Sequence, residues 1–576
     1  MSRFALFAVL LVAATGPVAA APVPKEPTGR PWSMFGGTPA RNMANRTEKL
    51  PALPREGPDW TRADAAKTWE AEWVLWSAPL GSRCNSSPIV AGGKVFVGTN
   101  NQQPRNARDM RLVKGGPPEP LDKGVLMCFD ERTGQFLWQA VHDMLPAGGV
   151  NNWPREGVCS APAVIGDRVY YVSNQCRVVC LDANGFANGN QGIQTEKYRD
   201  KTDADIIWEY DMIRELDVFP HCVANGSPLV VGDRIFVCTS NGVDESHINI
   251  PSPNAPSLIC LDRSTGKLLW KDSSPGKNVM HGQWSSPAYS ADPVPQVIQG
   301  QGDGWLRGFD AATGKLLWKF DGNRKGATFD IGGTGEKSDF LATPVVDGGR
   351  VFIGTGQDPE HSAGPGNLWC IDLKKAVDLG AKADGRDVSP DLVVKVERNP
   401  GGADKVVTKA NPASALAWVF GGQETRKWAP LDFKFGRTLS TVAVVDEVVY
   451  AADILGHVHC LSAQTGEPFW QYDTRASIWG SPYCVDGKVL LCTDAGDLFA
   501  FKHTAKPPRF DALDAAKGAA NRREARATFK DVRAQVEKAC LLARVELPST
   551  IRSTPVVANG VLFVATENTL YAIRKR

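Results

Sequence analysis

A phrase of about a dozen residues recurs along the chain, and this repetition constrains the fold more than any other feature. The copies read CFDERTGQFLWQ (128–139), CLDRSTGKLLWK (260–271), GFDAATGKLLWK (308–319) and CLSAQTGEPFWQ (460–471). The two closest copies, at 260 and 308, begin 48 residues apart, which is near the roughly 40–50-residue period of a propeller blade. The chain is therefore expected to be a repeat array.

A second phrase precedes each copy and contains two short apolar strands around a turn rich in glycine and aspartate. Gly and Asp supply the backbone geometry that a tight hairpin needs. Followed by a third strand and an outer strand ending in Trp, it predicts a four-stranded antiparallel meander. The eight occurrences, two of them degenerate, lie at 86–99, 160–173, 226–239, 285–300, 342–355, 440–453, 480–493 and 553–566.

Eight such units predict an all-β fold, an eight-bladed β-propeller. The last unit ends after three strands, and the segment 72–81 has the pattern of an unpaired fourth strand. We expect it to close the ring against 553–576, because closure removes the free edges of the sheets. The propeller is thus assigned to 72–576, after an N-terminal extension at 21–71.

Two long insertions interrupt the repeats, at 376–414 and 504–548. Within the second, Phe529, Val532, Val536, Cys540 and Ala543 recur at helical spacing. This pattern predicts an amphipathic helix over 527–546 that packs on the ring.

The repeated phrase itself is interpreted as structural. Thr265-Gly266 forms the turn between the third and fourth strands, and Asp262 hydrogen-bonds the backbone of that turn. Trp270 ends the outer strand, where a large flat ring fills the wedge between neighbouring blades. The same register contains Trp138, Trp318 and Trp470, and Trp208 and Trp418 are looser equivalents after insertions.

The pattern A/C-x-D-x-x-T-G-x-x-x-W resembles the tryptophan-docking repeat of the pyrroloquinoline quinone (PQQ) β-propeller superfamily. That superfamily includes quinoprotein alcohol dehydrogenases and BamB-like propellers of outer-membrane assembly. The resemblance implies the fold directly. It leaves function open, because the superfamily holds both enzymes and binding scaffolds.

The N-terminus predicts export. Arg3 precedes an apolar run at 4–14, and small residues follow up to Ala20, which together are typical of a cleaved signal peptide over 1–20. No cysteine stands near the cleavage site and no later apolar stretch is long enough to span a bilayer. We expect a monomeric periplasmic or secreted protein without a transmembrane anchor. The net charge of +2 argues against nucleic acid as a partner.

The thirteen cysteines mostly follow the repeat. Eight occupy slots in buried strands, where a small apolar side chain is needed, and are expected to be free thiols. They are Cys128, Cys180, Cys238, Cys260, Cys370, Cys460, Cys484 and Cys492. Cys176 and Cys180 lie four residues apart, a spacing that allows either a local disulfide or two free thiols.

Loops before each inner strand, and loops joining second to third strands, should meet at one axial mouth of a propeller. Convergent polar groups and aromatic rings there are candidates for a ligand site. The residues expected to bind are Arg83, His221, His281, Gln283, Trp284, Arg437, Trp479 and Arg552. Asp303 and Asp358 are the acidic candidates for catalysis. Asp358 and Glu360, in GQDPEH (356–361), are candidates for a hard cation. The alternative is that all these groups satisfy one another and ordered water.

The resemblance adds one further criterion. Quinoprotein alcohol dehydrogenases hold PQQ between a Trp floor and two adjacent, disulfide-linked cysteines, and they use calcium and a catalytic Asp. This chain has no Cys-Cys pair. The prediction is therefore a non-catalytic propeller that binds a protein, glycan or small molecule at its axial face. The alternative is a divergent alcohol or sugar dehydrogenase that uses PQQ and calcium without the disulfide.

Overall fold

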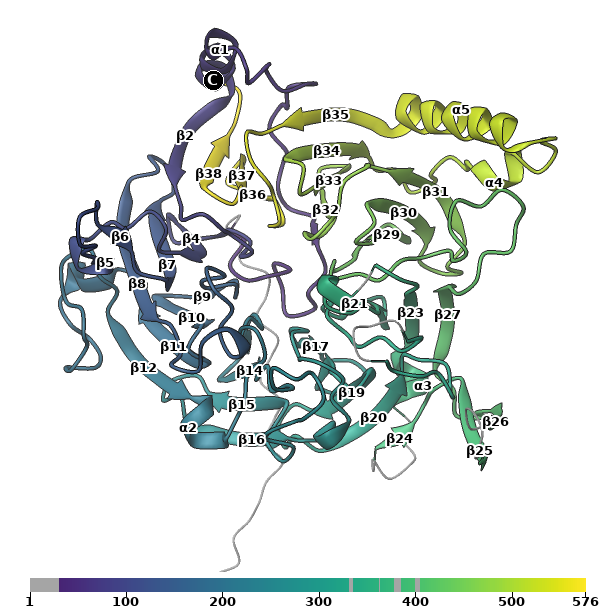
Figure 1. The fold of residues 1–576 in the computed structure, drawn as a ribbon, viewed down its shortest axis with the longest axis horizontal. Helices are drawn as coiled ribbons and strands as arrows, with labels where there is room; N and C mark the ends of the chain where they lie inside the picture. Colours follow the sequence, from purple (N-terminus) through teal and green to yellow (C-terminus); the bar gives the residue numbers. More distant parts are fainter. Residues whose placement is uncertain (1–30, 331–334, 362, 378–384, 399–404) are drawn as a thin grey trace, which may run out of the picture.

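The computed structural model describes residues 31–330, 335–361, 363–377, 385–398 and 405–576. The predicted signal peptide lies outside these residues. The described residues form eight four-stranded antiparallel sheets arranged in a ring around a central axis (Figure 1). The predicted eight-bladed propeller is confirmed.

The blades follow the sequence repeats, each running from an inner strand at the axis to an outer strand. Blade 1 contains β3 (Ile89–Ala91), β4 (Lys94–Asn100), β7 (Lys123–Asp130) and β8 (Phe136–Asp143). Blade 2 contains β9 (Ala163–Ile165), β10 (Arg168–Val172), β11 (Arg177–Asp182) and β12 (Ile206–Asp211). Blade 3 contains β13 (Leu229–Val231), β14 (Arg234–Cys238), β15 (Leu258–Asp262) and β16 (Leu268–Asp272). Blade 4 contains β17 (Ala288–Ser290), β18 (Gln296–Gly300), β19 (Trp305–Asp310) and β20 (Leu316–Asp321).

The second half of the ring repeats this order. Blade 5 contains β21 (Val345–Asp347), β22 (Arg350–Gly354), β23 (Asn367–Asp372) and β27 (Leu416–Gly421). Blade 6 contains β28 (Ala443–Val445), β29 (Val448–Ala452), β30 (His457–Ser462) and β31 (Pro468–Asp473). Blade 7 contains β32 (Tyr483–Val485), β33 (Lys488–Cys492), β34 (Asp497–Lys502) and β35 (Leu541–Glu546). Blade 8 contains β36 (Val556–Ala558), β37 (Val561–Ala565), β38 (Thr569–Ile573) and β2 (Val74–Pro79).

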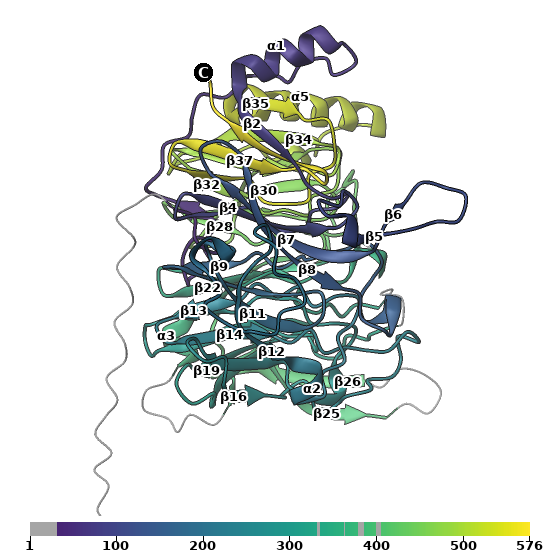
Figure 2. The same ribbon diagram turned by 90° about the vertical axis from the view of Figure 1, so that its left-hand side faces the viewer.

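The ring closes as predicted, because β2 pairs antiparallel with β38 and supplies the outer strand of blade 8. The remaining elements decorate the ring. They are β1 (Ala44–Asn45), α1 (Ala63–Trp73), β5 (Met110–Arg111), β6 (Glu119–Pro120), α2 (Met212–Leu216), α3 (Leu373–Ala376), β24 (Arg386–Asp387), β25 (Asp391–Glu397), β26 (Lys405–Ala410), α4 (Ala512–Ala515) and α5 (Arg522–Cys540). Figure 2 shows α1 and α5 at the rim of the ring seen edge-on. No helix among the described residues is both long and apolar enough to cross a membrane.

The predicted amphipathic helix is α5, with Val532, Val536 and Cys540 on its buried face. Its predicted end at 546 is wrong. The helix stops at Cys540, and the next six residues form β35, the outer strand of blade 7. Ala543 is therefore a buried residue of a strand and not of the helix.

Tryptophan docking joins successive blades. The Trp208 indole Nε1–H of blade 2 donates to the Arg263 carbonyl of blade 3, at 3.2 Å. A Cβ added to Gly266 would lie 2.5 Å from Trp208, so the Thr-Gly turn of one blade holds the ring of the previous blade. Trp270 repeats the arrangement, with its Nε1 bonded to the Ala311 carbonyl of blade 4. The structural interpretation of the repeated phrase is confirmed.

An N-terminal segment, 32–45, crosses the axis, and we call it the axial strap. Inner strands of a propeller leave backbone groups unpaired at the axis, and such edges need partners. The strap supplies them, for it bonds to an inner strand or its leading loop in every blade. The contacts reach Val90, Val164, Ser227, Tyr289, Val346, Val444, Cys484 and Val557. Within the strap, the buried Arg41 guanidinium donates to four carbonyl oxygens, at 2.7–3.0 Å.

All thirteen cysteines are free thiols in the structure. The eight assigned to repeat slots are buried, as predicted. Cys176 and Cys180 are also unbridged.

Candidate functional site: the axial pocket

A cavity of about 650 Å³ lies on the axis, above the axial strap. This size falls within the roughly 300–1,000 Å³ of typical ligand pockets. Every blade contributes to its wall through the loop that precedes the inner strand, and Phe35 of the strap contributes as well. Five of the predicted residues line the cavity: Arg83, Trp284, Asp358, Trp479 and Arg552.

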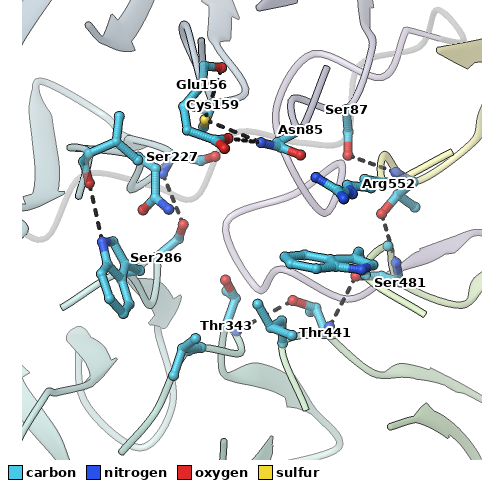
Figure 3. Close-up of a pocket in the computed structure, with 18 of the residues that line it drawn as sticks. Asn85, Ser87, Glu156, Cys159, Ser227, Ser286, Thr343, Thr441, Ser481 and Arg552 are labelled. Atoms are coloured by element: carbon cyan, nitrogen blue, oxygen red, sulfur yellow. Dashed lines mark hydrogen bonds between the residues drawn. The ribbon is translucent and has the colours of Figure 1, made fainter. Parts of the chain in front are cut away.

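A ring of hydroxyl groups forms the inner wall of the pocket (Figure 3). The backbone N–H of one blade donates to the Ser or Thr hydroxyl of the next, for example Thr441 N to Ser481 Oγ at 3.0 Å. The same bond joins Ser481 to Thr554 and Thr554 to Ser87, at 2.9 and 3.1 Å. The Ser or Thr before the Pro of the repeat therefore holds neighbouring blades together at the axis through its hydroxyl group.

Arg552 and Trp479 form the most distinctive contact of the pocket. The Arg552 guanidinium carbon lies 4.6 Å from the Trp479 ring centroid, within cation–π range. In the described part of the chain, no carboxylate lies within ion-pair distance of Arg552. Its Nε is buried and has no hydrogen-bond partner. Arg552 thus presents positive charge and unused donors at the pocket wall.

A second arginine is neutralised within the protein. Arg83 forms an ion pair with Glu156. The other carboxylate oxygen of Glu156 accepts from Asn85 Nδ2 at 2.7 Å (Figure 3). Cys159 lies beside the same amide, with a sulfur–nitrogen distance of 3.6 Å. Burial raises the pKa of the Cys159 thiol, which keeps it protonated near neutral pH. This side of the pocket is polar but internally paired.

Three other predicted residues do not line the cavity. Gln283 is buried and donates to the Asn241 carbonyl at 2.8 Å. Arg437 is buried and donates to Ser338 Oγ at 3.2 Å, and burial lowers its pKa. Asp303 is bound by both terminal nitrogens of Arg307, at 2.6 and 2.9 Å. These groups hold loops together behind the pocket.

His221 and His281 also lie outside the cavity wall, beside Trp284. The ring centroids of His281 and Trp284 are 5.4 Å apart. His247, from the loop between β14 and β15, joins them. The side chain of Glu360 lies outside the described residues, so the predicted pair with Asp358 remains a prediction.

The sequence did not single out Asn85, Glu156 or His247. Glu156 stood in a loop already assigned to the axial mouth, so its register was a usable signal. His247 lies in an insertion of blade 3, and nothing in the repeat marks such a residue. The pocket hydroxyls, such as Ser87 and Thr554, stand at the beginning of the second repeated phrase and were not among the predicted site residues.

The fold and pocket define the chain as an eight-bladed propeller of the tryptophan-docking type. The family model described as "Outer membrane protein assembly factor BamB" matches residues 122–383 and 403–528. The chain belongs to this family, within the PQQ propeller superfamily. The resemblance drawn from the repeat is confirmed.

Individual relatives are distant. A tetrathionate hydrolase of Acidithiobacillus ferrooxidans is 25% identical over 400 residues, which cover 61% of this chain and 73% of the relative. A europium-containing methanol dehydrogenase has a TM-score of 0.52 at 11% identity, covering 95% of this chain and 99% of that chain. The quinohemoprotein alcohol dehydrogenase of Comamonas testosteroni has a TM-score of 0.51 at 12% identity, covering 94% and 80%. At this identity the two structures are evidence for the fold alone.

Proposed function

We propose that this chain is an exported, non-catalytic binding propeller whose axial pocket takes a small anionic ligand. One observation carries the proposal, namely the Arg552 guanidinium stacked on Trp479 with no carboxylate partner. Arg552 is partly buried and its Nε has no hydrogen-bond partner, so an anionic group at that point would form charge-assisted hydrogen bonds with the guanidinium.

The rest of the wall supports a ligand with a flat body. Trp479 and Trp284 offer aromatic surface on two sides of the pocket. The hydroxyl ring beneath them adds polar groups that orient a ligand. Export is proposed from the N-terminal sequence pattern.

PQQ, a planar tricarboxylate, satisfies part of this description. The two Trp faces and Arg552 are suited to a flat anion, and they are the residues that would hold it. The calcium-assisted arrangement is poorly matched. Calcium takes roughly 6–8 oxygen ligands, and of the carboxylates at the pocket wall Glu156 is already engaged by Arg83 and Asn85. This is why we favour binding over dehydrogenation.

The second candidate comes from the relative named a tetrathionate hydrolase. Tetrathionate is a dianion, and its charge is of the sign that Arg552 would attract. Both probes can therefore be tested on the same pocket.

The test is isothermal titration calorimetry of the mature protein with PQQ, with tetrathionate, and with glucose as an uncharged control. At least one anion should bind and glucose should not. Arg552→Met should weaken that binding about tenfold or more, because a hydrogen bond to a charged group contributes about 1.5–3 kcal/mol. Arg509→Met is the matched control, since Arg509 also lies over a ring, Phe469, but at the outer surface.

Two outcomes contradict the proposal. The first is that neither anion binds. The second is that an anion binds and Arg552→Met leaves its affinity unchanged. Dye-linked alcohol oxidation by the protein loaded with PQQ and calcium would instead support the dehydrogenase reading, and product release from tetrathionate would support a hydrolase.

A further inference from the structure

Half of the eight histidines gather beside the axial pocket, from four separate loops. His221 precedes β13, His247 lies between β14 and β15, and His281 precedes β17. The ring centroids of His221 and His281 are 4.2 Å apart, and those of His247 and His281 are 4.8 Å apart. His361, at the end of a short 3₁₀ turn, lies 4.3 Å from His281 by the same measure.

The two innermost rings are almost fully buried. The exposed fraction is 2% for His221 and 4% for His281. His221 Nδ1 lies 2.7 Å from the Val243 carbonyl oxygen and must donate to it, which leaves a lone pair on Nε2. That Nε2 has no hydrogen-bond partner, and neither nitrogen of His281 has one.

Unpartnered buried nitrogens are unusual because each costs about 1–3 kcal/mol. The other histidines of this chain behave ordinarily. His142 bonds to the Tyr171 hydroxyl, His457 and His459 both bond to Asp453, and His503 bonds to Tyr450 and Asp446. Among the described histidines, buried imidazole nitrogens without a partner therefore occur only at His221, His281 and His361, which indicates that something else binds there.

We propose that His221, His247 and His281, the histidine cluster, hold a divalent transition-metal ion through imidazole nitrogens. One ligand atom from each residue lies within 4.8 Å of the others. Tetrahedral zinc, with Zn–N distances of about 2.0–2.1 Å, would bring such nitrogens to roughly 3.4 Å apart. Modest side-chain rotations close that gap.

The protonation of the cluster is compatible with this ligand set. Burial, together with the neighbouring His221, His361 and His247, lowers the pKa of His281 to about 2. Burial also lowers the pKa of His221 and of His361. Neutral imidazole is the form that ligates metal, so protons compete little near pH 7.

The donor set selects the class of ion. Imidazole nitrogen suits zinc, copper and nickel, whereas calcium and magnesium prefer oxygen. The carbonyl of Val243 fixes the tautomer of His221, as outer-sphere acceptors do for metal-bound histidines. Such an ion would tie the insertion carrying His247 to the inner loops of blades 3 and 4. His361 is placed to become a fourth ligand.

The experiment uses the tag-free mature chain after EDTA treatment and dialysis. Zn²⁺ titration should saturate at one ion per chain, with Ca²⁺ giving no signal. Copper added in its place should show nitrogen superhyperfine splitting in its electron paramagnetic resonance spectrum. The melting temperature should rise with Zn²⁺, because an ion that binds only the folded state stabilises it.

Variants separate the cluster from general surface binding. His247→Gln, at a half-buried position, and His281→Gln should each weaken Zn²⁺ binding by more than the roughly 10–100-fold that loss of an outer-sphere contact costs. His503→Gln, outside the cluster, should bind as the parent chain does. The proposal is overturned by an absence of saturable Zn²⁺ binding. It is equally overturned if both cluster variants, still folded by circular dichroism, keep the parental affinity.

Discussion

Replacing Gly266 by alanine tests the docking of one blade on the next. The backbone at Gly266 has φ +69°, where an L-residue costs about 1–2 kcal/mol. The added Cβ would also lie 2.5 Å from Trp208 Cε3, against roughly 3.5–4.0 Å for a comfortable carbon contact. Overpacking of this kind costs typically about 1–3 kcal/mol. The total expected loss of unfolding free energy is about 2–5 kcal/mol.

Gly487→Ala is the matched control. Gly487 has φ +67° in the hairpin between β32 and β33, and a Cβ there would meet nothing within 4 Å. Both variants place alanine at a positive φ, and both reduce the conformational freedom of the unfolded chain by the same substitution. Their difference, about 1–3 kcal/mol, therefore isolates the contact with Trp208.

The assay is urea unfolding followed by far-ultraviolet circular dichroism, with the free energies compared as a double-mutant cycle. In a Trp208→Leu background, the Gly266→Ala penalty should fall to that of Gly487→Ala. Equal penalties for Gly266→Ala and Gly487→Ala in the parent chain would refute the docking argument. So would a Gly266→Ala penalty that survives removal of Trp208.

Two further predictions concern buried polar groups. Burial lowers the pKa of His142 to about 4, against about 6.5 in an unfolded chain. Protonation of His142 therefore favours the unfolded chain. The stability of the folded chain that depends on neutral His142 is complete above pH 6.5 and is lost as the pH falls from 6.5 to 4. His142→Gln should remove roughly 3 kcal/mol of that acid sensitivity, measured as unfolding free energy against pH; an unchanged pH profile would contradict the assignment. Arg41→Met should leave buried carbonyl oxygens without donors and destabilise the chain by about 3 kcal/mol or more in urea unfolding. A loss within experimental error would show that the strap does not depend on this residue.

The fold was predictable because the sequence pattern of a blade occurs eight times in the chain. Trp270 and Thr265-Gly266 recur with their partners at fixed offsets, so local pattern and long-range packing carry the same information. The end of α5 was not predictable in this way. Leu541–Glu546 follows Cys540 without a Gly or Pro, and Ala543 lies at a spacing that suits both a helix and the inward face of a strand. Pairing with β34, far away in sequence, decides between them.

The site was only partly predictable, for a related reason. Loop register correctly brought Arg83, Trp284 and Arg552 to one cavity, because loops before inner strands converge at the axis. Register does not say how each loop folds on itself. Gln283 turns back to a backbone carbonyl and Asp303 to Arg307, and both bonds depend on side-chain conformations that a repeat alignment does not contain.

The axial strap has a consequence for the order in which the molecule can be assembled. Its residues precede every blade in the chain, yet they bond to strands as distant as Val557, and β2 completes the blade that ends at Ile573. The strap can bond to blades 1 to 7 before blade 8 exists, but its contact with Val557 and the pairing of β2 with β38 must wait for the last blade. The last contact of the strap and the closure of the ring therefore form in the same late step, since both depend on contacts of very high sequence separation. A chain truncated before blade 8 would lack both the closed ring and the complete contacts of the axial strap. No incomplete propeller could therefore present the whole pocket.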